Sequence, residues 1–257
     1  MILCFDIGNT DIDVGVFEND VHTRDFRVPY KKDRTCWNHL GNILKALQAE
    51  RIKPEEVKGS ILCSVVKSAT QGVYEALEIA FTHKPVLFEN NEEFTGITIK
   101  TDDPQEVGLD IIAGCMTVKE KYALPAVVVD MGTGTTLTAM DAEGSILGVS
   151  IVIGVAASLQ ALNRRTGLPV DLSLTAPPKA IGTNTADSIA SGAVLGNAYL
   201  MDGMIAAFEK EMGTKCNVYA TGGIADRIMP LCSHENVIND DLLLDGLYIY
   251  YKRVKGL

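Results

Sequence analysis

The apolar run Met1-Ile2-Leu3-Cys4-Phe5 leads directly into the turn sequence Asp6-Ile7-Gly8-Asn9-Thr10. The same unit recurs in the middle of the chain, where Pro125-Ala126-Val127-Val128-Val129 leads into Asp130-Met131-Gly132-Thr133-Gly134-Thr135-Thr136. Short apolar runs rich in β-branched residues predict buried strands, and the glycine that follows each aspartate predicts a turn. A repeat of this kind predicts two related halves that each open with a hairpin.

A second strand is expected after each turn. Ile12, Val14 and Val16 alternate with other residues at the period of a half-buried strand, and Leu137-Thr138-Ala139-Met140-Asp141 follows the second turn. Apolar residues at helical spacing over 35–48 and short apolar runs over 61–66, 146–153 and 217–220 complete an alternation typical of the α/β class. We place the boundary near a helix that begins around Val107, so that residues 1–112 form the N-terminal half and residues 113–257 the C-terminal half.

The two turns have the chemistry of phosphate-binding loops. Glycine lets the backbone approach a ligand closely, successive backbone N–H groups point at phosphate oxygens, and threonine hydroxyls add hydrogen bonds. Because a carboxylate repels a phosphate, Asp6 and Asp130 call for a divalent cation, bound directly or through water. One such turn is ordinary turn chemistry, but two copies at matching places predict a nucleotide-binding cleft between the halves.

Composition argues against several classes of protein. With 23 Lys and Arg against 33 Asp and Glu, the net charge of −10 argues against a nucleic-acid partner, which requires a basic surface. A hydrophobic content of 47% is typical of a folded globular chain. The N-terminal apolar run is too short for a signal peptide or a membrane span, so no membrane association is expected. Six cysteines without a metal-binding pattern indicate reduced thiols in a cytoplasmic protein.

Other nucleotide-binding motifs are missing from the sequence, which has no Walker A loop, no dinucleotide fingerprint and no protein-kinase signature. The duplicated Asp-Gly hairpin resembles the superfamily of sugar kinases, actin and heat-shock ATPases. Within it, the chain resembles the type III pantothenate kinases over nearly its whole length. The matching motifs, in order, are Asp6-Ile-Gly-Asn-Thr10, Gly108-Leu-Asp110, Asp130-Met-Gly-Thr-Gly-Thr-Thr136, Gly167-Leu-Pro169, Ile181-Gly-Thr-Asn-Thr185, Ser191-Gly192 with Gly196, Thr221-Gly-Gly223 and Leu242-Leu-Leu-Asp-Gly-Leu247.

The resemblance implies a fold and an activity. The fold is two similar ribonuclease H-like halves, each with a mixed sheet, around a nucleotide cleft. The activity is phosphorylation of the primary hydroxyl of pantothenate by ATP, the first step of coenzyme A biosynthesis. Members of the family use Mg²⁺ and a monovalent cation, K⁺ or NH₄⁺, and they form homodimers with the acceptor sites at the subunit interface. A small-molecule substrate and a homodimer are therefore expected.

The resemblance also assigns roles to individual residues. The expected residues for ATP, its phosphates and the adenosine segment are Asp6, Gly8, Asn9, Thr10, Asp130, Gly132, Thr133, Thr135, Thr136, Thr221, Gly222 and Gly223. Asp6 and Asp130 are the expected metal ligands, and Asp110 is the expected general base toward the acceptor hydroxyl. The expected acceptor-site residues are Gly108, Ile111, Gly154 and Thr185.

Two of these residues also have ordinary structural interpretations. Asp110 stands near a predicted helix N-terminus, where an acidic side chain stabilises the helix dipole. Thr185 stands where another helix should begin, and threonine is a common N-cap residue. The inward-facing stripe of that second helix is then expected to be Ile189, Ala193, Gly196 and Leu200.

The sequence departs from the family around the acceptor and keeps the ATP motifs. Ile111 stands where the family usually has an arginine that holds the pantothenate carboxylate, and Val149 and Ile153 replace a glycine and a proline of a family loop. Three interpretations are open. The chain is a pantothenate kinase whose carboxylate anchor has moved to Arg164 or Arg165, a kinase of this fold with a different small-molecule acceptor, or a non-catalytic nucleotide-binding paralogue that acts as a regulator.

Overall fold

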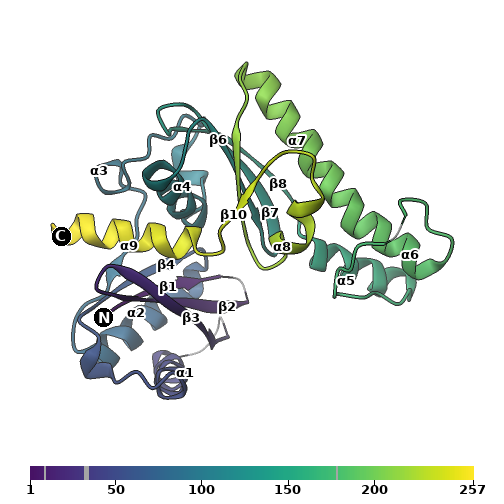
Figure 1. Ribbon diagram of the computed structural model, residues 1–257. Coiled ribbons are helices and arrows are strands. Elements are labelled where there is room, and N and C mark those ends of the chain that lie inside the picture. Colours follow the sequence, from purple (N-terminus) through teal and green to yellow (C-terminus); the bar gives the residue numbers. More distant parts are fainter. Residues whose placement is uncertain (9, 32–34, 178) are drawn as a thin grey trace. The chain divides into compact units, whose positions relative to one another are not determined.

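The computed structural model describes residues 1–8, 10–31, 35–177 and 179–257, and its chain divides into two compact units (Figure 1). Unit 1 comprises Met1–Ile97, Gln105–Thr117 and Leu242–Leu257. Unit 2 comprises Thr98–Pro104 and Val118–Asp241. Each unit contains a five-stranded sheet with both parallel and antiparallel pairs, so the predicted α/β class is confirmed. The domain boundary at residue 112 stays a prediction.

The sheet of unit 1 is built on the predicted N-terminal hairpin. Strands β1 (Ile2–Ile7) and β2 (Asp11–Glu18) pair antiparallel, and the spatial order is β3-β2-β1-β4-β5. Strand β4 pairs parallel with β1, which makes the sheet mixed. The other elements of this unit, including the first part of α4, are β3 (Val21–Pro29), α1 (Cys36–Ala49), β4 (Gly59–Ser64), α2 (Lys67–Phe81), β5 (Val86–Leu87), α3 (Glu92–Thr95), α4 (Leu109–Lys121) and α9 (Leu242–Lys255).

The sheet of unit 2 repeats this topology. Strands β6 (Ala126–Met131) and β7 (Gly134–Met140) form the second predicted hairpin, and the spatial order is β10-β9-β6-β7-β8. Strand β9 pairs parallel with β6, as β4 does with β1. Its other elements are β8 (Ile146–Ile153), α5 (Val155–Thr166), α6 (Thr185–Ala190), a π-helical turn (Ser191–Leu195), α7 (Gly196–Met212), β9 (Asn217–Thr221), α8 (Ala225–Ile228) and β10 (Val237–Ile238).

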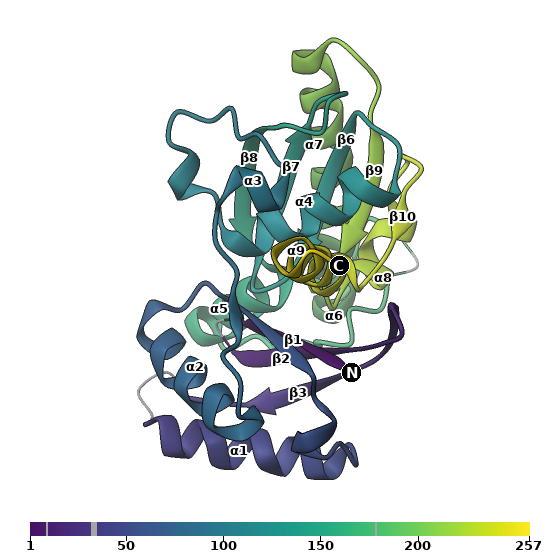
Figure 2. The same ribbon diagram turned by 90° about the vertical axis from the view of Figure 1, so that its left-hand side faces the viewer.

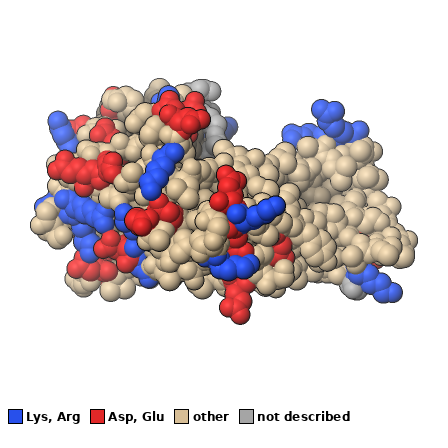
Figure 3. All heavy atoms as spheres, turned by 90° about the horizontal axis from the view of Figure 1, so that it is seen from above, with Lys and Arg blue, Asp and Glu red and all other residues tan. Residues whose placement is uncertain are grey.

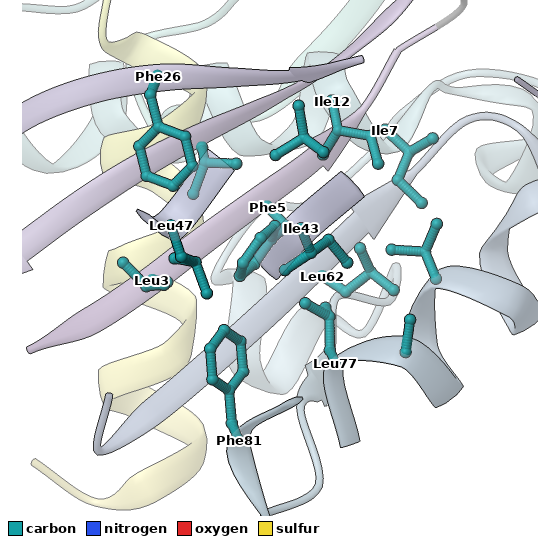
Figure 4. Packing of buried hydrophobic residues seen from close by; sticks show 14 of the residues in the cluster. Leu3, Phe5, Ile7, Ile12, Phe26, Ile43, Leu47, Leu62, Leu77 and Phe81 are labelled. Atoms are coloured by element: carbon teal, nitrogen blue, oxygen red, sulfur yellow. The ribbon is translucent and has the colours of Figure 1, made fainter. Parts of the chain in front are cut away.

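Alternation along β1 decides which side chains enter the core of unit 1. Leu3, Phe5 and Ile7 are fully buried in an apolar cluster that also takes side chains from α1 and α2 (Figure 4). Because successive residues of a strand point to opposite faces, Cys4 and Asp6 face the other side of the sheet. The predicted strand thus places its aspartate outside the main cluster.

Helix α9 covers part of that other face. In Figure 2 it is seen end-on between α4 and β1, and the backbone of α4 approaches it so closely that a Cβ at Gly246 would collide with the carbonyl oxygen of Ala113. The hydroxyl of Thr117 donates a hydrogen bond of 2.7 Å to the carbonyl of Leu242, which ties the two helices together. Leu244 packs over Gly15 of β2.

The helical region of unit 2 differs from its prediction in two ways. Asn184 is the N-cap of α6, where its side chain accepts a hydrogen bond from the backbone of Asp187, so the assignment of this cap to Thr185 is wrong by one residue. The predicted stripe is wrong after Ala193, because the π-helical turn inserts an extra residue into the helical repeat. Beyond this turn Gly196 and Leu200 are exposed. The buried side chains are those of Val194, Ala198, Met201 and Ile205.

Other sequence-based expectations concern cysteines, membranes and surface charge. All six cysteines lie among the described residues and are free thiols, three of them buried. Within the described ranges, no helix is long and apolar enough to span a membrane. Figure 3 shows acidic and basic side chains intermixed on one face, so the acidic surplus is not gathered in a single area there.

Replacement of Gly246 by alanine tests the α4–α9 contact. We expect Gly246→Ala to lower the free energy of unfolding by about 1–3 kcal/mol, because the added methyl group meets backbone and cannot be relieved by rotating a side chain. Gly41→Ala in α1 is the matched control, since open space surrounds that glycine and alanine favours a helix by up to about 1 kcal/mol. Urea unfolding that ranks both variants as equally stable would contradict this packing.

Candidate functional site

The turn of the first hairpin carries the earliest predicted site residues. Asp6 is 8% exposed at the end of β1, Gly8 is half-buried, and Thr10 is exposed beyond it. The amide of Gly8 donates to the carbonyl of Asp11 at 3.1 Å, which closes the turn. Tyr30 donates its hydroxyl to the carbonyl of Gly8 at 2.6 Å and braces the turn from β3's end. The predicted ligand Asn9 lies outside the described residues.

Asp6 belongs to a row of polar side chains that runs across the sheet. Its register partners are Asp13 on β2 and Cys63 on β4, and Asp13 in turn pairs with Arg27 on β3. The guanidinium Nε of Arg27 donates to the carboxylate of Asp13 at 2.7 Å, and the positive charge of Arg27 balances the negative charge of Asp13. Directly opposed like charges destabilise a sheet, so this ion pair lowers the cost of keeping Asp6 and Asp13 side by side.

Asp110, the predicted base, lies in the same unit as this row. It occupies the first turn of α4, and its carboxylate accepts a hydrogen bond of 2.8 Å from the backbone of Ile111. Burial raises the pKa of Asp110 above the ordinary value, although the backbone hydrogen bonds lower it. Burial raises the pKa of the Cys63 thiol, and the charges of Asp6 and Asp110 raise it further. Both acids belong to unit 1.

Gly108 precedes the helix and fits closely against this carboxylate. A Cβ at Gly108 would collide with a carboxylate oxygen of Asp110, so the small residue leaves the space that the acid occupies. Ile111 is half-buried and presents only hydrocarbon. The segment Gly108 to Ile111 therefore contributes one carboxylate and no cation.

The second hairpin repeats the first row in unit 2. Asp130 at the end of β6 has Thr136 on β7 and Thr221 on β9 as register partners. Thr221 thus stands in the second sheet where Cys63 stands in the first. The hydroxyl of Thr221 donates to the carbonyl of Asp240 at 3.2 Å.

The end of β8 and the 221–223 segment both approach the second turn closely, at Gly154 and at Gly222. The amide of Gly154 donates to the carbonyl of Thr133 at 3.1 Å, and a Cβ at Gly154 would collide with the carbonyl of Gly132. Gly222 has a φ of +97°, and a Cβ there would come within 2.7 Å of both the Asp130 carboxylate and the Met131 backbone. Unit 2 therefore brings together predicted residues that are far apart in sequence.

The residues of the second turn differ in exposure. Gly132 and Thr133 are exposed, and Thr136 is half-buried on the face of Asp130. Thr135 is fully buried, and its hydroxyl has no hydrogen-bond partner among the described residues. A buried hydroxyl in that state costs about 1–3 kcal/mol.

Thr185 lines an open pocket of about 790 Å³ in the helical region of unit 2. Leucine and isoleucine side chains form its apolar part, and among the described residues none that lines it is charged. Its hydroxyl and amide side chains are those of Ser158, Thr183, Asn184, Thr185, Ser188 and Asn197. Arg164 and Arg165 are exposed in the last turn of α5 and do not line it. The pocket suits a ligand with hydroxyl or amide groups on an aliphatic frame.

Two groups beside the first turn were missed from the sequence. Asp13 lies in an alternating pattern and Cys63 in a continuous apolar run, and each indicates only a strand. Strand pairing makes both of them register partners of Asp6. The available signal was the small polar end of the strand, Cys63-Ser64, which resembles Thr221-Gly222 at the end of β9. Recognising it requires knowing that β4 and β9 are equivalent strands.

Comparisons with known proteins agree with these features. A family model for type III pantothenate kinase matches residues 2–207. The chain is 35% identical to a type III pantothenate kinase of Thermomicrobium roseum over 99% of its own length and 98% of that protein. Among solved structures, a Campylobacter jejuni protein assigned to the Baf family of transcriptional activators has a TM-score of 0.64 at 18% identity, covering 99% of this chain and all of that one. An Arthrobacter polyphosphate/ATP-glucomannokinase has a TM-score of 0.50 at 13% identity, covering 100% and 99%.

Adjacent glycines allow a matched test of how the 221–223 segment is seated. We expect Gly222→Ala to lower the free energy of unfolding by about 2–4 kcal/mol, because the cost of a positive φ adds to the cost of a collision between the new methyl group and the backbone. Gly223→Ala should leave stability within about 0.5 kcal/mol, since open space surrounds Gly223. Thermal and urea unfolding measure both. Equal destabilisation by the two substitutions would contradict the described seating.

Proposed function

Because the chain belongs to the type III pantothenate kinase family, we propose that Asp110 is the general base of the ATP-dependent phosphorylation of pantothenate. The protein is a kinase that acts in coenzyme A biosynthesis. The observation that carries the proposal is the placement of the Asp110 carboxylate in the first turn of α4, held by the amide of Ile111, in the same unit as Asp6. Phosphoryl transfer of this kind commonly uses one carboxylate that holds Mg²⁺ at the phosphates and another that accepts the proton of the acceptor hydroxyl.

Asp110 has a raised pKa, as a general base requires. Its carboxylate is held by the amide of Ile111, and burial raises its pKa toward the range where proton transfer is efficient. As the γ-phosphoryl group leaves ATP, the acceptor hydroxyl gives its proton to Asp110 and its oxygen attacks phosphorus. Positioned general bases of this kind contribute about 10²- to 10⁴-fold to the rate.

The two hairpin turns are proposed to hold the phosphates of ATP. The amides of Gly8 and Gly132 already donate within their own turns, so the exposed residues Thr10 and Thr133 are the proposed phosphate donors. The segment 221–223 is proposed to lie near the adenosine. Asp6 and Asp130 fit Mg²⁺, because that ion prefers hard carboxylate oxygens and phosphate oxygens. Bound Mg²⁺ would neutralise phosphate charge beside these acids.

The acceptor is proposed to use the pocket that Thr185 lines. Pantothenate is an aliphatic amide with hydroxyl groups, and the uncharged polar lining matches that part of it. Gly108, Ile111 and Gly154 are proposed acceptor-site residues on the basis of the family motifs. A monovalent cation (K⁺ or NH₄⁺), a homodimer and a cytoplasmic location are proposed on the same basis.

Replacement of Asp110 by asparagine tests the base. We expect Asp110→Asn to lower kcat by about 10²- to 10⁴-fold while the affinity for Mg-ATP, measured by calorimetry, stays within about threefold. Asp102→Asn, at an exposed position, is the control and should match the wild type. Full turnover by Asp110→Asn would overturn the assignment.

The pH dependence of kcat/KM tests the same residue independently. A base works only when unprotonated, so activity should be lost as pH falls through the pKa of Asp110. Because burial raises that pKa, the acidic limb should lie above the ordinary aspartate range. The residual activity of Asp110→Asn should lack this limb. If the acidic limb persists unchanged in the variant, the limb reports the titration of another group and not of Asp110.

A further inference from the structure

The segment 171–175 of unit 2 contains a residue in an unfavourable backbone conformation. Leu174 has a φ of +54°, in the left-handed region that a bulky apolar residue rarely adopts. Its side chain is nevertheless buried and belongs to the apolar cluster of unit 2. Backbone strain of this kind costs about 1–3 kcal/mol and persists only where the surrounding structure enforces it. Contacts around Leu174 therefore hold it in this conformation.

Arg227 on α8 provides such contacts from another part of the chain. Its guanidinium Nη1 donates to the carbonyl of Ser173 at 2.7 Å and to that of Leu172 at 3.4 Å. Within the segment, the carboxylate of Asp171 accepts a hydrogen bond of 2.8 Å from the amide of Ser173. Arginine suits this arrangement because one guanidinium can donate to two acceptors at once. The two carbonyls immediately before Leu174 are thus fixed from α8.

Helix α8 gives Arg227 a fixed backbone. The amide of Ala225 donates to the carbonyl of Gly222 at 2.9 Å, and the amide of Arg227 donates to the carbonyl of Ile224 at 3.1 Å. Ala225 is fully buried in the apolar cluster that contains Leu174. Gly222 is itself seated closely against the second hairpin turn. Arg227 therefore reaches the segment 171–175 from a base that the second hairpin turn determines.

The segment 171–175 borders a second cavity, of about 200 Å³, next to the pocket that Thr185 lines. Asp171, Leu174 and Thr175 form part of its wall. The residues that line both cavities are Leu159, Ile189 and Ala193. Movement of Leu174 would change the space behind these shared side chains, which would then be free to shift out of the Thr185 pocket. The conformation of the segment therefore bears on the shape of that pocket.

We propose that Arg227 is a positioning residue for the acceptor, because it holds the segment 171–175 in its strained conformation and thereby keeps the Thr185 pocket in shape. The proposal rests on the proposed use of that pocket by the acceptor. With Arg227 present, the pocket is preformed. Without it, Leu174 relaxes toward an ordinary φ, and binding of the acceptor must restore the strained conformation. The apparent affinity for the acceptor then falls by the fraction of molecules that are relaxed.

Arg253 in unit 1 provides a matched control. Its Nη1 donates to the carbonyl of Thr95 at 2.7 Å and to that of Phe94 at 3.1 Å, so it also holds two consecutive carbonyls. None of these three residues lines either cavity. Arg227→Ala and Arg253→Ala therefore remove equivalent contacts. They differ in whether the segment that is held borders the cavities.

Steady-state kinetics with pantothenate test the proposal. We expect Arg227→Ala to raise the KM for pantothenate about 3- to 10-fold, as loss of hydrogen bonds from an exposed charged group predicts, with kcat and the KM for Mg-ATP within about twofold. Arg227→Lys keeps a charged donor and should return the KM for pantothenate to within about twofold of the wild type. Arg253→Ala should lower the midpoint of thermal unfolding with both KM values unchanged. An unchanged KM for pantothenate in Arg227→Ala, or an equal rise in Arg253→Ala, would overturn the proposal.

Hydrogen exchange of the backbone tests the contact without turnover. The amide of Ser173 is bonded within the segment, so its exchange reports whether the segment opens. We expect the exchange to be about 3- to 10-fold faster in Arg227→Ala and unchanged in Arg253→Ala. Exchange at the wild-type rate in Arg227→Ala would refute the hold on the segment. Faster exchange with an unchanged KM for pantothenate would show that the segment is held but does not shape the pocket, which also overturns the proposal.

The failures of this proposal and of the proposed function are distinguishable. Asp110→Asn is expected to change kcat, whereas Arg227→Ala is expected to change the KM for pantothenate. Full turnover by Asp110→Asn with a raised KM in Arg227→Ala would discard the base and retain Arg227. If the wild type neither binds nor phosphorylates pantothenate, the proposed acceptor is wrong and the role of Arg227 toward it falls as well, while hydrogen exchange still decides whether Arg227 holds the segment.

Discussion

The pleat of two strands is the constraint on which the site depends. In β1, the residues before and after Asp6 face the apolar cluster of unit 1, so Asp6 must face the opposite side. In β6, Val129 and Met131 place Asp130 in the same way. A shift of either strand by one residue would drive a carboxylate into hydrocarbon, so apolar packing on one face orients the acids on the other.

The sheet face that carries Asp6 has two parts, one covered by a helix and one that carries a row of polar side chains. Helix α9 covers its other part, where Leu244 packs over Gly15 and Tyr251 lies over Gly59. The row of Asp6, Asp13 and Cys63 comes at the end of β1, next to the turn. Glycines in the covered part admit the helix, and polar side chains occupy the remaining row. One sheet face thereby carries both an apolar packing surface and a row of polar side chains.

The helical region of unit 2 follows different packing rules from the two sheets. A π-helical turn between α6 and α7 changes which residues face inward, and it leaves Gly196 and Leu200 exposed. Such turns are frequent at functional sites because the extra residue re-aims side chains. The neighbouring pocket is lined by uncharged residues, which contrasts with the acidic rows at the hairpins. The pocket and the hairpin turns thus differ in chemical character.

The sequence by itself determined the hairpins, the α/β class, the family and the glycine turns, because these depend on local periodicity and on contiguous motifs. The sequence placed the cap at Thr185, one residue after the observed cap. It also gave the wrong inward-facing stripe beyond Ala193, because a regular helical period does not show the extra residue of the π-helical turn. Only the tertiary structure decided that Cys63 and Asp13 flank Asp6 and that Gly154 and Gly222 close on the second turn. Those contacts join residues far apart in the chain, and strand register and backbone packing create them.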